Sequence, residues 1–417
     1  MKLRDAVLLL PLLLSACVEQ LVKPVDSNHA PTCAAAETLP PLQVPDAERH
    51  TPPAPIKPGE PPKGNEYGLL RPAEWTSLSG FEQDNLAAAW DALKQSCSAL
   101  RKHDSWRSAC EAIAQAPAAS NDTIRTLLRE QFTPYQVTNP DGSSTGLITG
   151  YYEPLLAGSR TRTERYRFPL YARPDDLISV ELGSLYPELA GRRLRGKMSG
   201  DKVTPYYSRG EIEITPSPLA GRELVWVDDI VDLFFLQVQG SGIIKMENGD
   251  SLHVGYADQN GQPYQSIGKV LIDRGELTVD KASMQGIKEW GRRNLNKLRD
   301  LLNSNPSYVF FRELPGGLGG PLGALGVPIA AERSLAIDPR YIPLGAPVFL
   351  STTYPNSNKP LQRLMLAQDT GGAIKGAVRA DFYWGTGFEA GRQAGGMKQR
   401  DSRMWVLLPK GYLPNGK

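Results

Sequence analysis

The sequence predicts a mainly β protein with some helices (α+β), in which one domain is inserted into another. The 35 prolines and 40 glycines indicate many turns, which favours a β-rich chain over a helical bundle. Helical spacing of apolar residues occurs between Leu78 and Leu128 and again before Pro306, and strand-like patterns follow each stretch. Because the order is helices, strands, helices, strands, we expect an outer domain made from both ends of the chain.

The overall composition is that of a globular protein without a nucleic-acid partner. The chain is 41% hydrophobic and 22% charged, with a formal net charge of +2, so it can bury a sizeable core. No segment carries the dense basic stripe that nucleic-acid binding needs. We also expect no metal and no other cofactor, because there is no C-x-x-C pair and the histidines are scattered along the sequence.

The N-terminus has the pattern of an exported lipoprotein. A short basic start precedes the apolar run Ala6–Leu14, which is too short to span a bilayer and fits a secretory signal. The run ends in "LSAC", which looks like a bacterial lipobox. We therefore predict a signal peptide over 1–16 and lipidation of Cys17. Val18 follows, where an aspartate would indicate inner-membrane retention, so we expect an anchor in the outer membrane with the protein on its periplasmic face.

The segment that follows the lipidation site is expected to be a tether. Residues 17–65 are rich in proline, in runs such as "TPPAPIKPGEPPKG", and show no apolar periodicity. Beyond it, Cys97 and Cys110 lie in a predicted helix–turn–helix, and in an oxidising compartment they are expected to form a disulfide. Cys33 has no evident partner.

Two stretches before the first strands carry helical signals. In "FEQDNLAAAWDALKQSC" the apolar residues from Phe81 to Cys97 recur at three- to five-residue steps. In "ASNDTIRTLLREQF" a second helix is predicted, with its N-cap at Asn121 or Asp122.

Two aspartates stand out in "LAQDTGGAIKGAVRADFYWG". In a strand "VRADFYWG", Ala380 and Phe382 share one face, while Arg379 and Asp381 share the other. Such a strand packs against the core on one side and holds an acid rigidly on the other. The alternative is a solvated surface aspartate.

Asp369 ends the apolar strand "RLMLAQD" and precedes the glycine-rich turn "TGGAIKG". An anion-binding nest could form there, but no G-K-[ST] signature follows, which argues against a phosphate loop. A third aspartate, Asp338, precedes a proline in "LAIDPRYIPLG". We assign it a structural role in a turn.

Polar residues in two further stretches suit contact with a sugar polymer. Interpreted as a strand, "FFLQVQGSG" places Gln237, Gln239 and Ser241 on one face, where amide groups can bond sugar hydroxyls or N-acetyl groups. The stretch "GLITGYYEP" adds Thr149 and Tyr151, whose ring could lie against a pyranose. The alternatives are a solvated sheet face and ordinary core or hairpin packing.

Seven ordered motifs together resemble a known family. They are "GLITGYYEP", "PYYSRGEIE", "FFLQVQGSG", "NPSYVFFRE", "AIDPRYIPLG", "AQDTGGAIKG" and "ADFYWG". In this order they are similar to the membrane-bound lytic murein transglycosylase A family, and the C-terminal segment also resembles the double-psi β-barrel of expansins.

The resemblance implies a division of the chain into two domains with a groove between them. A double-psi β-barrel domain would comprise 66–153 with its helices and 301–417 with the three aspartates. A small β-barrel domain would be inserted at 154–300, and peptidoglycan strands would lie in the groove.

The resemblance also implies the reaction. The bond between N-acetylmuramic acid and N-acetylglucosamine is cut without water, because the muramyl 6-hydroxyl attacks its own anomeric carbon and leaves a 1,6-anhydro end. The family's single catalytic aspartate matches Asp381, and Asp369 matches its companion. Substrate contacts are expected from Thr149, Tyr151, Gln237, Gln239, Ser241 and Trp384. Cell-wall enzyme complexes are further expected partners.

One acid can suffice for such a reaction, since the nucleophile belongs to the substrate. To act first as an acid, Asp381 needs a pKa above the usual 3.9 of an aspartate. We expect burial and the like charge of Asp369 to raise it, with Arg379 directed to a substrate carboxylate or to solvent. Two alternatives stay open at this point: a hydrolytic glycosidase on the same barrel, and a peptidoglycan-binding lipoprotein without activity.

Overall fold

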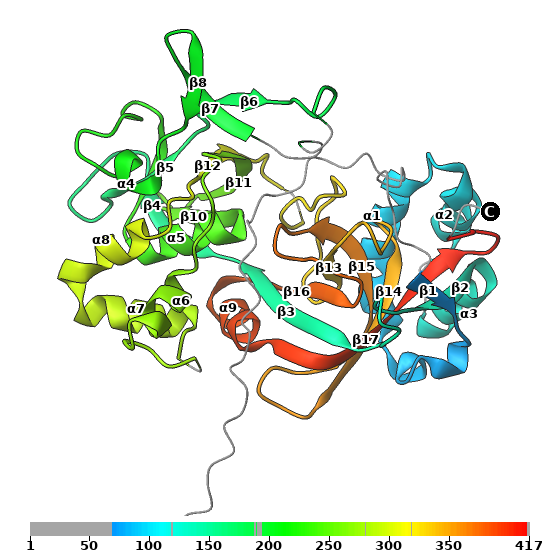
Figure 1. The fold of residues 1–417 in the computed structure, drawn as a ribbon. Helices are drawn as coiled ribbons and strands as arrows, with labels where there is room; N and C mark the ends of the chain where they lie inside the picture. The colour runs from blue at the N-terminus through cyan, green and yellow to red at the C-terminus, as the bar shows by residue number, and fades with distance from the viewer. Residues whose placement is uncertain are drawn as a thin grey trace, which may run out of the picture. The chain divides into compact units, whose positions relative to one another are not determined.

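The computed structural model describes residues 69–414, except 118–119, 187–188, 190–193, 280 and 318. Within these residues the chain is mainly β, with helices at its start and in its middle (Figure 1). The predicted fold class is confirmed. The predicted signal peptide and the predicted tether, with Cys17 and Cys33, lie outside the described residues.

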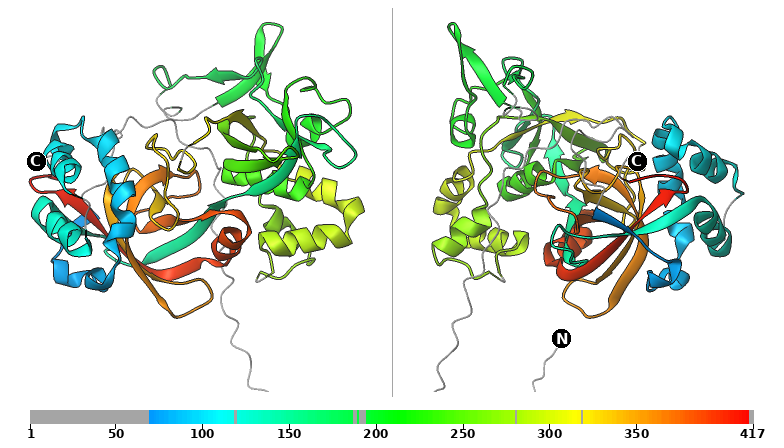
Figure 2. Two further views of the ribbon diagram at one scale, coloured as in Figure 1. Left: turned by 180° about the vertical axis from the view of Figure 1, so that it is seen from behind. Right: turned by 45° about the vertical axis from the view of Figure 1, so that its right-hand side comes forward.

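Six strands close into a barrel that draws on both ends of the described chain. Their order is β17-β14-β15-β13-β16-β3, and β3 pairs back onto β17 (Figure 1, Figure 2). The strands are β3 (Gly146–Glu153), β13 (Ser334–Ile337), β14 (Pro347–Thr353), β15 (Pro360–Thr370), β16 (Arg379–Thr386) and β17 (Lys398–Pro409). Two more strands, β1 (Leu70–Pro72) and β2 (Phe132–Val137), extend the sheet beyond β17. The helix α9 (Gly387–Gly396) connects β16 to β17.

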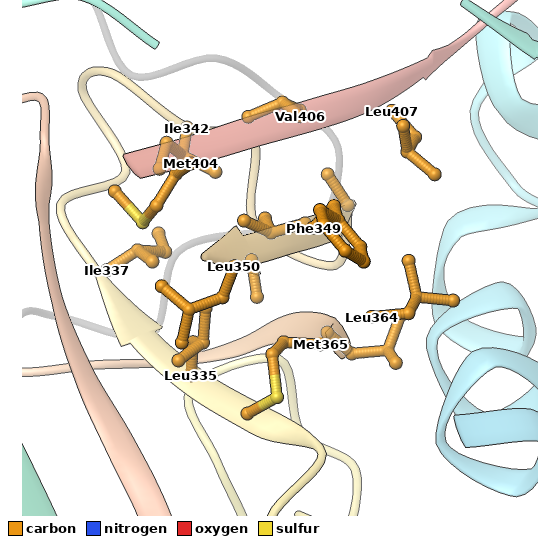
Figure 3. Packing of buried hydrophobic residues seen from close by; sticks show 14 of the residues in the cluster. Leu335, Ile337, Ile342, Phe349, Leu350, Leu364, Met365, Met404, Val406 and Leu407 are labelled. Carbon is orange, nitrogen blue, oxygen red and sulfur yellow. The ribbon is translucent and has the colours of Figure 1, made fainter. Parts of the chain in front are cut away.

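The pairing in this barrel is mixed, and its interior is apolar. The pairs β13–β15 and β16–β3 are parallel, whereas β13–β16, β14–β15 and β14–β17 are antiparallel. Side chains from β13, β14, β15 and β17 gather in one cluster (Figure 3). Leu335, Phe349, Met365 and Val406 are fully buried there. Each such side chain contributes about 1.5–3 kcal/mol relative to an exposed one, so the barrel is a rigid base for the polar residues on its rim.

The N-terminal helices begin later than the apolar spacing predicted. The helices are α1 (Trp90–Leu100), α2 (Asp104–Gln115) and α3 (Asn121–Gln131). Between Trp75 and Ala89 the chain forms only short 3-10 turns, because the backbone is extended at Asp84, whose carboxylate turns inward to a buried ion pair with Arg333, at 3.1 Å. The N-cap of α3 is Ser120, one residue before the first of the two predicted positions, and its hydroxyl accepts the N–H of Thr123.

A disulfide joins α1 to α2. Cys97 and Cys110 are bonded in the structure, with a Cα–Cα distance of 5.0 Å. Both residues are buried in the same apolar cluster as the barrel interior. The bond therefore ties the first two helices together where they pack on the outer domain.

A second sheet is built from one contiguous stretch of the chain. Its strand order is β12-β11-β10-β4-β9-β5, and a bridge between Ala172 and Phe311 links its two edges into a small barrel. The strands are β4 (Leu155–Ser159), β5 (Phe168–Tyr171), β9 (Glu223–Val227), β10 (Ser241–Met246), β11 (Ser251–Gln259) and β12 (Val309–Glu313). Since β12 pairs with β11, the inserted sheet runs to Glu313, beyond the boundary at 300 that the sequence suggested.

The inserted segment also holds a three-stranded sheet and five helices among the described residues. The sheet comprises β6 (Ile178–Val180), β7 (Leu194–Ser199) and β8 (Lys202–Pro205). The helices are α4 (Arg209–Ile212), α5 (Ile230–Gln239), α6 (Ile267–Asp273), α7 (Met284–Arg293) and α8 (Leu295–Asn303). Helix α5 packs on the small barrel through Leu233 and Leu236.

Candidate active site

The two aspartates lie on either side of one residue in the outer barrel. In the sheet register, Ala336 of β13 is opposite Asp381 of β16 and also opposite Asp369 of β15. Neighbouring strands are about 4.8 Å apart, so the two Cα atoms are roughly 10 Å apart. Opposed residues in a sheet point to the same face. Both carboxyl groups are half-buried and both line a cavity of about 630 Å³.

Asp381 is held through one of its two carboxyl oxygens. The hydroxyl of Thr149, its neighbour on β3, donates to Oδ1 at 2.6 Å. Within the described part of the chain, Oδ2 has no hydrogen-bond partner. One oxygen is thus fixed, and the other is free to exchange a proton with a ligand in the cavity.

Arg379 fixes the direction of the Thr149 hydroxyl. Its Nη2 donates to Thr149 Oγ1 at 2.9 Å, and its Nη1 donates to the carbonyl oxygens of Leu147 and Ala380. Because Thr149 Oγ1 accepts from Arg379, its own hydrogen is directed to Asp381. Arg379 is therefore directed away from the carboxyl group, as expected, but to Thr149 and the backbone rather than to solvent or a ligand.

Asp369 is more completely hydrogen-bonded than Asp381. Its Oδ1 accepts the backbone N–H groups of Ala324 and Thr370, at 3.0 and 2.9 Å. Its Oδ2 accepts the hydroxyl of Tyr151 at 3.0 Å. Thr149 and Tyr151 are two residues apart on β3 and therefore share one face, so a single strand supplies one hydroxyl donor to each aspartate.

The environment raises the pKa of both carboxyl groups. Burial raises the pKa of Asp381, against the positive charge of Arg379 and the hydrogen bond from Thr149, which lower it. Burial raises the pKa of Asp369 to about 6, opposed by its three hydrogen bonds and assisted by the charge of Asp381. Burial and the charge of Asp369 raise the pKa of Tyr151 well above its ordinary value, so its hydroxyl stays protonated. The net rise expected for Asp381 is present, although burial rather than Asp369 causes it.

The strand predicted for "FFLQVQGSG" is wrong. Residues up to Gln239 form helix α5, Gly240 ends it with a φ of 82°, and β10 begins at Ser241. The sequence held the signals for this helix: Asp229 accepts the N–H groups of Val231 and Asp232 as an N-cap, and a glycine follows the last turn. The apolar run between them has no period that distinguishes a strand from a helix.

The polar residues of this stretch nevertheless meet at the cavity. Gln237, Gln239 and Ser241 all line it, as does Tyr151. Gln239 Oε1 accepts the backbone N–H of Tyr152 at 3.3 Å, which links the end of α5 to β3. The predicted grouping is therefore present, but the end of a helix creates it rather than one face of a strand.

Arg209 is a site residue that no sequence pattern singled out. It is 3% exposed and lines the cavity, and its Nη2 donates to Gln237 Oε1 at 2.5 Å. The same guanidinium binds the carbonyl oxygens of Asn305 and Ser307 and pairs with Glu213 at 3.2 Å. These contacts fix the side chain of Gln237. Only the motif "PYYSRGEIE" could have indicated it.

Trp384 does not lie at the cavity, contrary to the expectation of a substrate contact. It is 7% exposed, belongs to the apolar core and directs its Nε1 to the sulfur of Met397 at 3.3 Å. Gly150 of β3 permits this packing, since a Cβ at that position would lie 2.7 Å from Trp384 Nε1. Alternation along β16 already places Trp384 on the core face, opposite Asp381.

Asp338 has the structural role predicted for it. It is 1% exposed and accepts from the backbone N–H of Arg340 and of Gly376. Burial would raise the pKa of Asp338, but the hydrogen bonds from Arg340 and Gly376 lower it overall. Among the described residues, no group of three or more His, Cys, Asp and Glu side chains is arranged to hold a metal ion.

Comparison with known proteins finds a family domain in each of two stretches of the chain. Residues 147–312 match the MltA specific insert domain, and residues 333–408 match the 3D domain. Membrane-bound lytic murein transglycosylase A of Escherichia coli (strain K12) is 33% identical over 304 residues, which cover 71% of this chain and 74% of that protein.

Solved structures agree with the sequence matches. The crystal structure of MltA from Neisseria gonorrhoeae has 38% identity and a TM-score of 0.75, covering 87% of this chain and 97% of that one. The crystal structure of E. coli MltA with bound chitohexaose has 27% identity and a TM-score of 0.61, covering 88% and 97%.

Proposed function

Because this chain belongs to the membrane-bound lytic murein transglycosylase A family, we propose that Asp381 is its single catalytic acid and base. The protein is an enzyme, a peptidoglycan lytic transglycosylase. Its reaction divides into two half-steps, and the same carboxyl group serves in both.

In the first half-step, Asp381 acts as an acid. Its protonated carboxyl group gives a proton to the oxygen between N-acetylmuramic acid and N-acetylglucosamine, and the bond from that oxygen to the muramyl C1 breaks. The raised pKa of Asp381 supports this role, because it favours the protonated form that an acid needs.

In the second half-step, the same carboxylate acts as a base. It takes the proton from the muramyl 6-hydroxyl while that oxygen bonds to C1, which gives the 1,6-anhydro end and restores the protonated acid. No water enters the product. An intramolecular attack has a large effective-molarity advantage, so a second carboxylate is not needed as nucleophile.

The observation that carries this assignment is the contrast between the two carboxyl groups. Asp381 has one oxygen held by Thr149 and one without a partner among the described residues, whereas both oxygens of Asp369 accept hydrogen bonds. We assign Asp369 a supporting role, in which it anchors Tyr151 and the backbone at Ala324. Tyr151, Gln237, Gln239 and Ser241 are proposed to contact the glycan, and Thr149 to act through Asp381.

The test is the mass of the products that the purified enzyme releases from sacculi. A 1,6-anhydro end is one water lighter than a reducing end. Asp381→Asn should keep the fold, and its rate of glycan cleavage should fall by more than the 10²–10⁴-fold typical of one acid–base step, since the residue serves both half-steps. Asp401→Asn, which changes an exposed aspartate on β17, is the matched control. If folded Asp381→Asn keeps a tenth of the wild-type rate, the assignment fails.

A hydrolytic reaction is the second candidate, and one observation favours it. The separation of roughly 10 Å between the Cα atoms of Asp369 and Asp381 is compatible with the roughly 6.5–9.5 Å between carboxyl groups in inverting glycosidases. Against it, Tyr151, Ala324 and Thr370 already use three of the roughly four acceptor sites of the Asp369 carboxylate, which leaves only one to activate a water. Products with reducing ends would decide for hydrolysis.

The protein is associated with a membrane, as the names of its relatives state for them. Among the described residues no helix is long and apolar enough to cross a bilayer. We propose that a lipid on Cys17 holds the protein at the periplasmic face of the outer membrane, with 17–65 as the tether. Replacing the leader and Cys17 by a cleavable signal without a lipidation site should release the enzyme into the soluble periplasmic fraction. Continued sedimentation with the outer membrane would contradict the lipid anchor.

A further inference from the structure

Two arginines line the cavity, and they differ in what they bind. Arg209 is buried and uses four of its five N–H donors on Glu213, Gln237 and two carbonyl oxygens. Arg312, on β12, is exposed, and within the described part of the chain its guanidinium has no hydrogen-bond or ion-pair partner. An arginine side chain carries five N–H donors and is always charged. Arg312 therefore presents a free cation to whatever occupies the cavity.

The sheet register places Arg312 beside residues already assigned to the glycan. Ser241 of β10 is opposite Gly255 of β11, and Gly255 is opposite Arg312 of β12. All three residues line the cavity. Gly255 has no side chain of its own between the other two, and the side chain of Leu314 lies over it, since a Cβ at Gly255 would be 2.9 Å from Leu314 Cδ1. The next residue, Glu313, points to the opposite face and pairs with Arg160.

The chemistry of the substrate leaves few groups for this cation. The N-acetyl and hydroxyl groups of the glycan backbone are neutral, and they suit the amides and hydroxyls at Gln237, Gln239 and Ser241. The anionic groups of a peptidoglycan strand are carboxylates that branch from the lactyl ether of muramic acid, either the lactyl carboxylate itself or those of an attached peptide. A guanidinium binds a carboxylate through two parallel hydrogen bonds, which makes it a specific partner for such a branch.

We propose that Arg312 binds a carboxylate on the lactyl branch of the muramyl residue and so selects peptidoglycan over neutral glycans in this cavity. The inference rests on the proposed function, because it takes peptidoglycan as the substrate. Arg312 also places a positive charge in the cavity, which reduces the repulsion of an anionic ligand by the negative charges of Asp369 and Asp381. Arg312 is a specificity residue here and has no part in the proton transfers.

The experiment measures binding without turnover. Soluble glycan fragments of one length are titrated into the full mature chain carrying Asp381→Asn, with and without Arg312→Gln. Three ligands are compared: fragments that carry their peptides, fragments stripped by an amidase so that only lactyl carboxylates remain, and neutral chitohexaose. Arg160→Gln is the matched control, because it removes an exposed arginine from the opposite face of the same sheet.

Arg312→Gln should weaken the binding of at least one carboxylate-bearing ligand about tenfold, the effect expected of one charge-assisted interaction. The dissociation constant for chitohexaose should not change. A loss confined to the peptide-bearing fragments assigns the carboxylate to the peptide, and a loss with stripped fragments assigns it to the lactyl group. Equal losses with all three ligands, or no loss with either carboxylate-bearing ligand, would overturn the proposal.

The proposed function fails separately from this inference. It fails if the wild-type enzyme releases no 1,6-anhydro products from sacculi, whatever the binding constants are. The proposal for Arg312 is tested by the binding constants alone, because binding to the Asp381→Asn variant does not require the reaction to proceed.

Discussion

Asp369→Asn tests whether the protein environment opposes ionisation of this carboxyl group. The substitution keeps the shape of the side chain, and the amide oxygen can still accept the N–H groups of Ala324 and Thr370. The new amide nitrogen faces Tyr151, whose hydroxyl can accept as well as donate. The main change is therefore the removal of one group that titrates.

The size and sign of the effect follow from the raised pKa of Asp369, about 6 against 3.8 for a free aspartate. Below pH 3.8 the carboxyl group is protonated in both the folded and the unfolded chain. Between pH 3.8 and 6 the unfolded chain loses the proton first, so the free energy of unfolding falls as pH rises. A pKa difference of about 2 corresponds to about 3 kcal/mol. Above pH 6 the loss is complete.

The measurement is urea unfolding of wild type and Asp369→Asn at intervals from about pH 4 to about pH 7.5. The transition to follow is that of the outer barrel, which contains Trp384 and Trp405. The difference between the free energies of unfolding of the two proteins at each pH cancels the contributions of the other titrating groups. As pH rises across this range, the free energy of unfolding of Asp369→Asn should increase relative to wild type by up to about 3 kcal/mol. Asp401→Asn should show no such trend. A difference that stays flat with pH would refute the reasoning.

Thr149→Val should lower activity and move the alkaline limb of the pH profile of kcat/KM to higher pH, because it removes a hydrogen bond that lowers the pKa of Asp381. If the limb does not move, ionisation of Asp381 does not set the alkaline limb. Replacing Cys97 and Cys110 by serine should cost about 3 kcal/mol in the free energy of unfolding, and peptide mapping without reductant that finds both thiols free in native protein would contradict the disulfide. Asp84→Ala should cost about 3–5 kcal/mol, since it leaves its buried arginine partner without a counter-charge; thermal unfolding close to that of wild type would show the pair to be dispensable. Chelator treatment should leave glycan cleavage unchanged, because the proposed chemistry needs only a proton donor, and activity restored by magnesium or calcium would contradict this.

Local patterns were sufficient for the parts of the site that lie on one strand. Alternation in "VRADFYWG" predicts that Asp381 faces away from the core, and the end of an apolar strand locates Asp369 next to a glycine-rich turn. Asp338 before a proline predicts a turn, which the structure has. These features depend on residues close together in the chain, so the sequence carries them directly.

The parts that the sequence did not predict depend on distant contacts. The backbone N–H of Ala324 reaches Asp369 from a loop 45 residues away, and no sequence pattern around either residue predicts that contact. Arg209 becomes part of the site only because it meets α5 and the loop before β12, whose contacting residues lie 28 and 96 positions further along the chain. The strand prediction at α5 is wrong for a local reason, because the alternation from Leu236 to Ser241 is typical of a strand although Asp229 and Gly240 cap a helix there.

The barrel that holds both aspartates is discontinuous in the chain, and this sets an order of assembly for a chain that emerges from its N-terminus. In the export proposed above, the inserted sheet from β4 to β12 would be complete once Glu313 had emerged, whereas β3 would gain its partners β16 and β17 only when the C-terminal part of the chain had followed. Thr149 and Asp381, which meet across that pairing, are 232 residues apart. Closing so long a loop has an entropic cost that must be met before its contacts stabilise it.

We therefore expect the inserted sheet to acquire hydrogen-exchange protection first and β3 last. Such an enzyme would stay inert toward the cell wall until its last strand had arrived, and early protection of β3 in pulse labelling would show that the order is different.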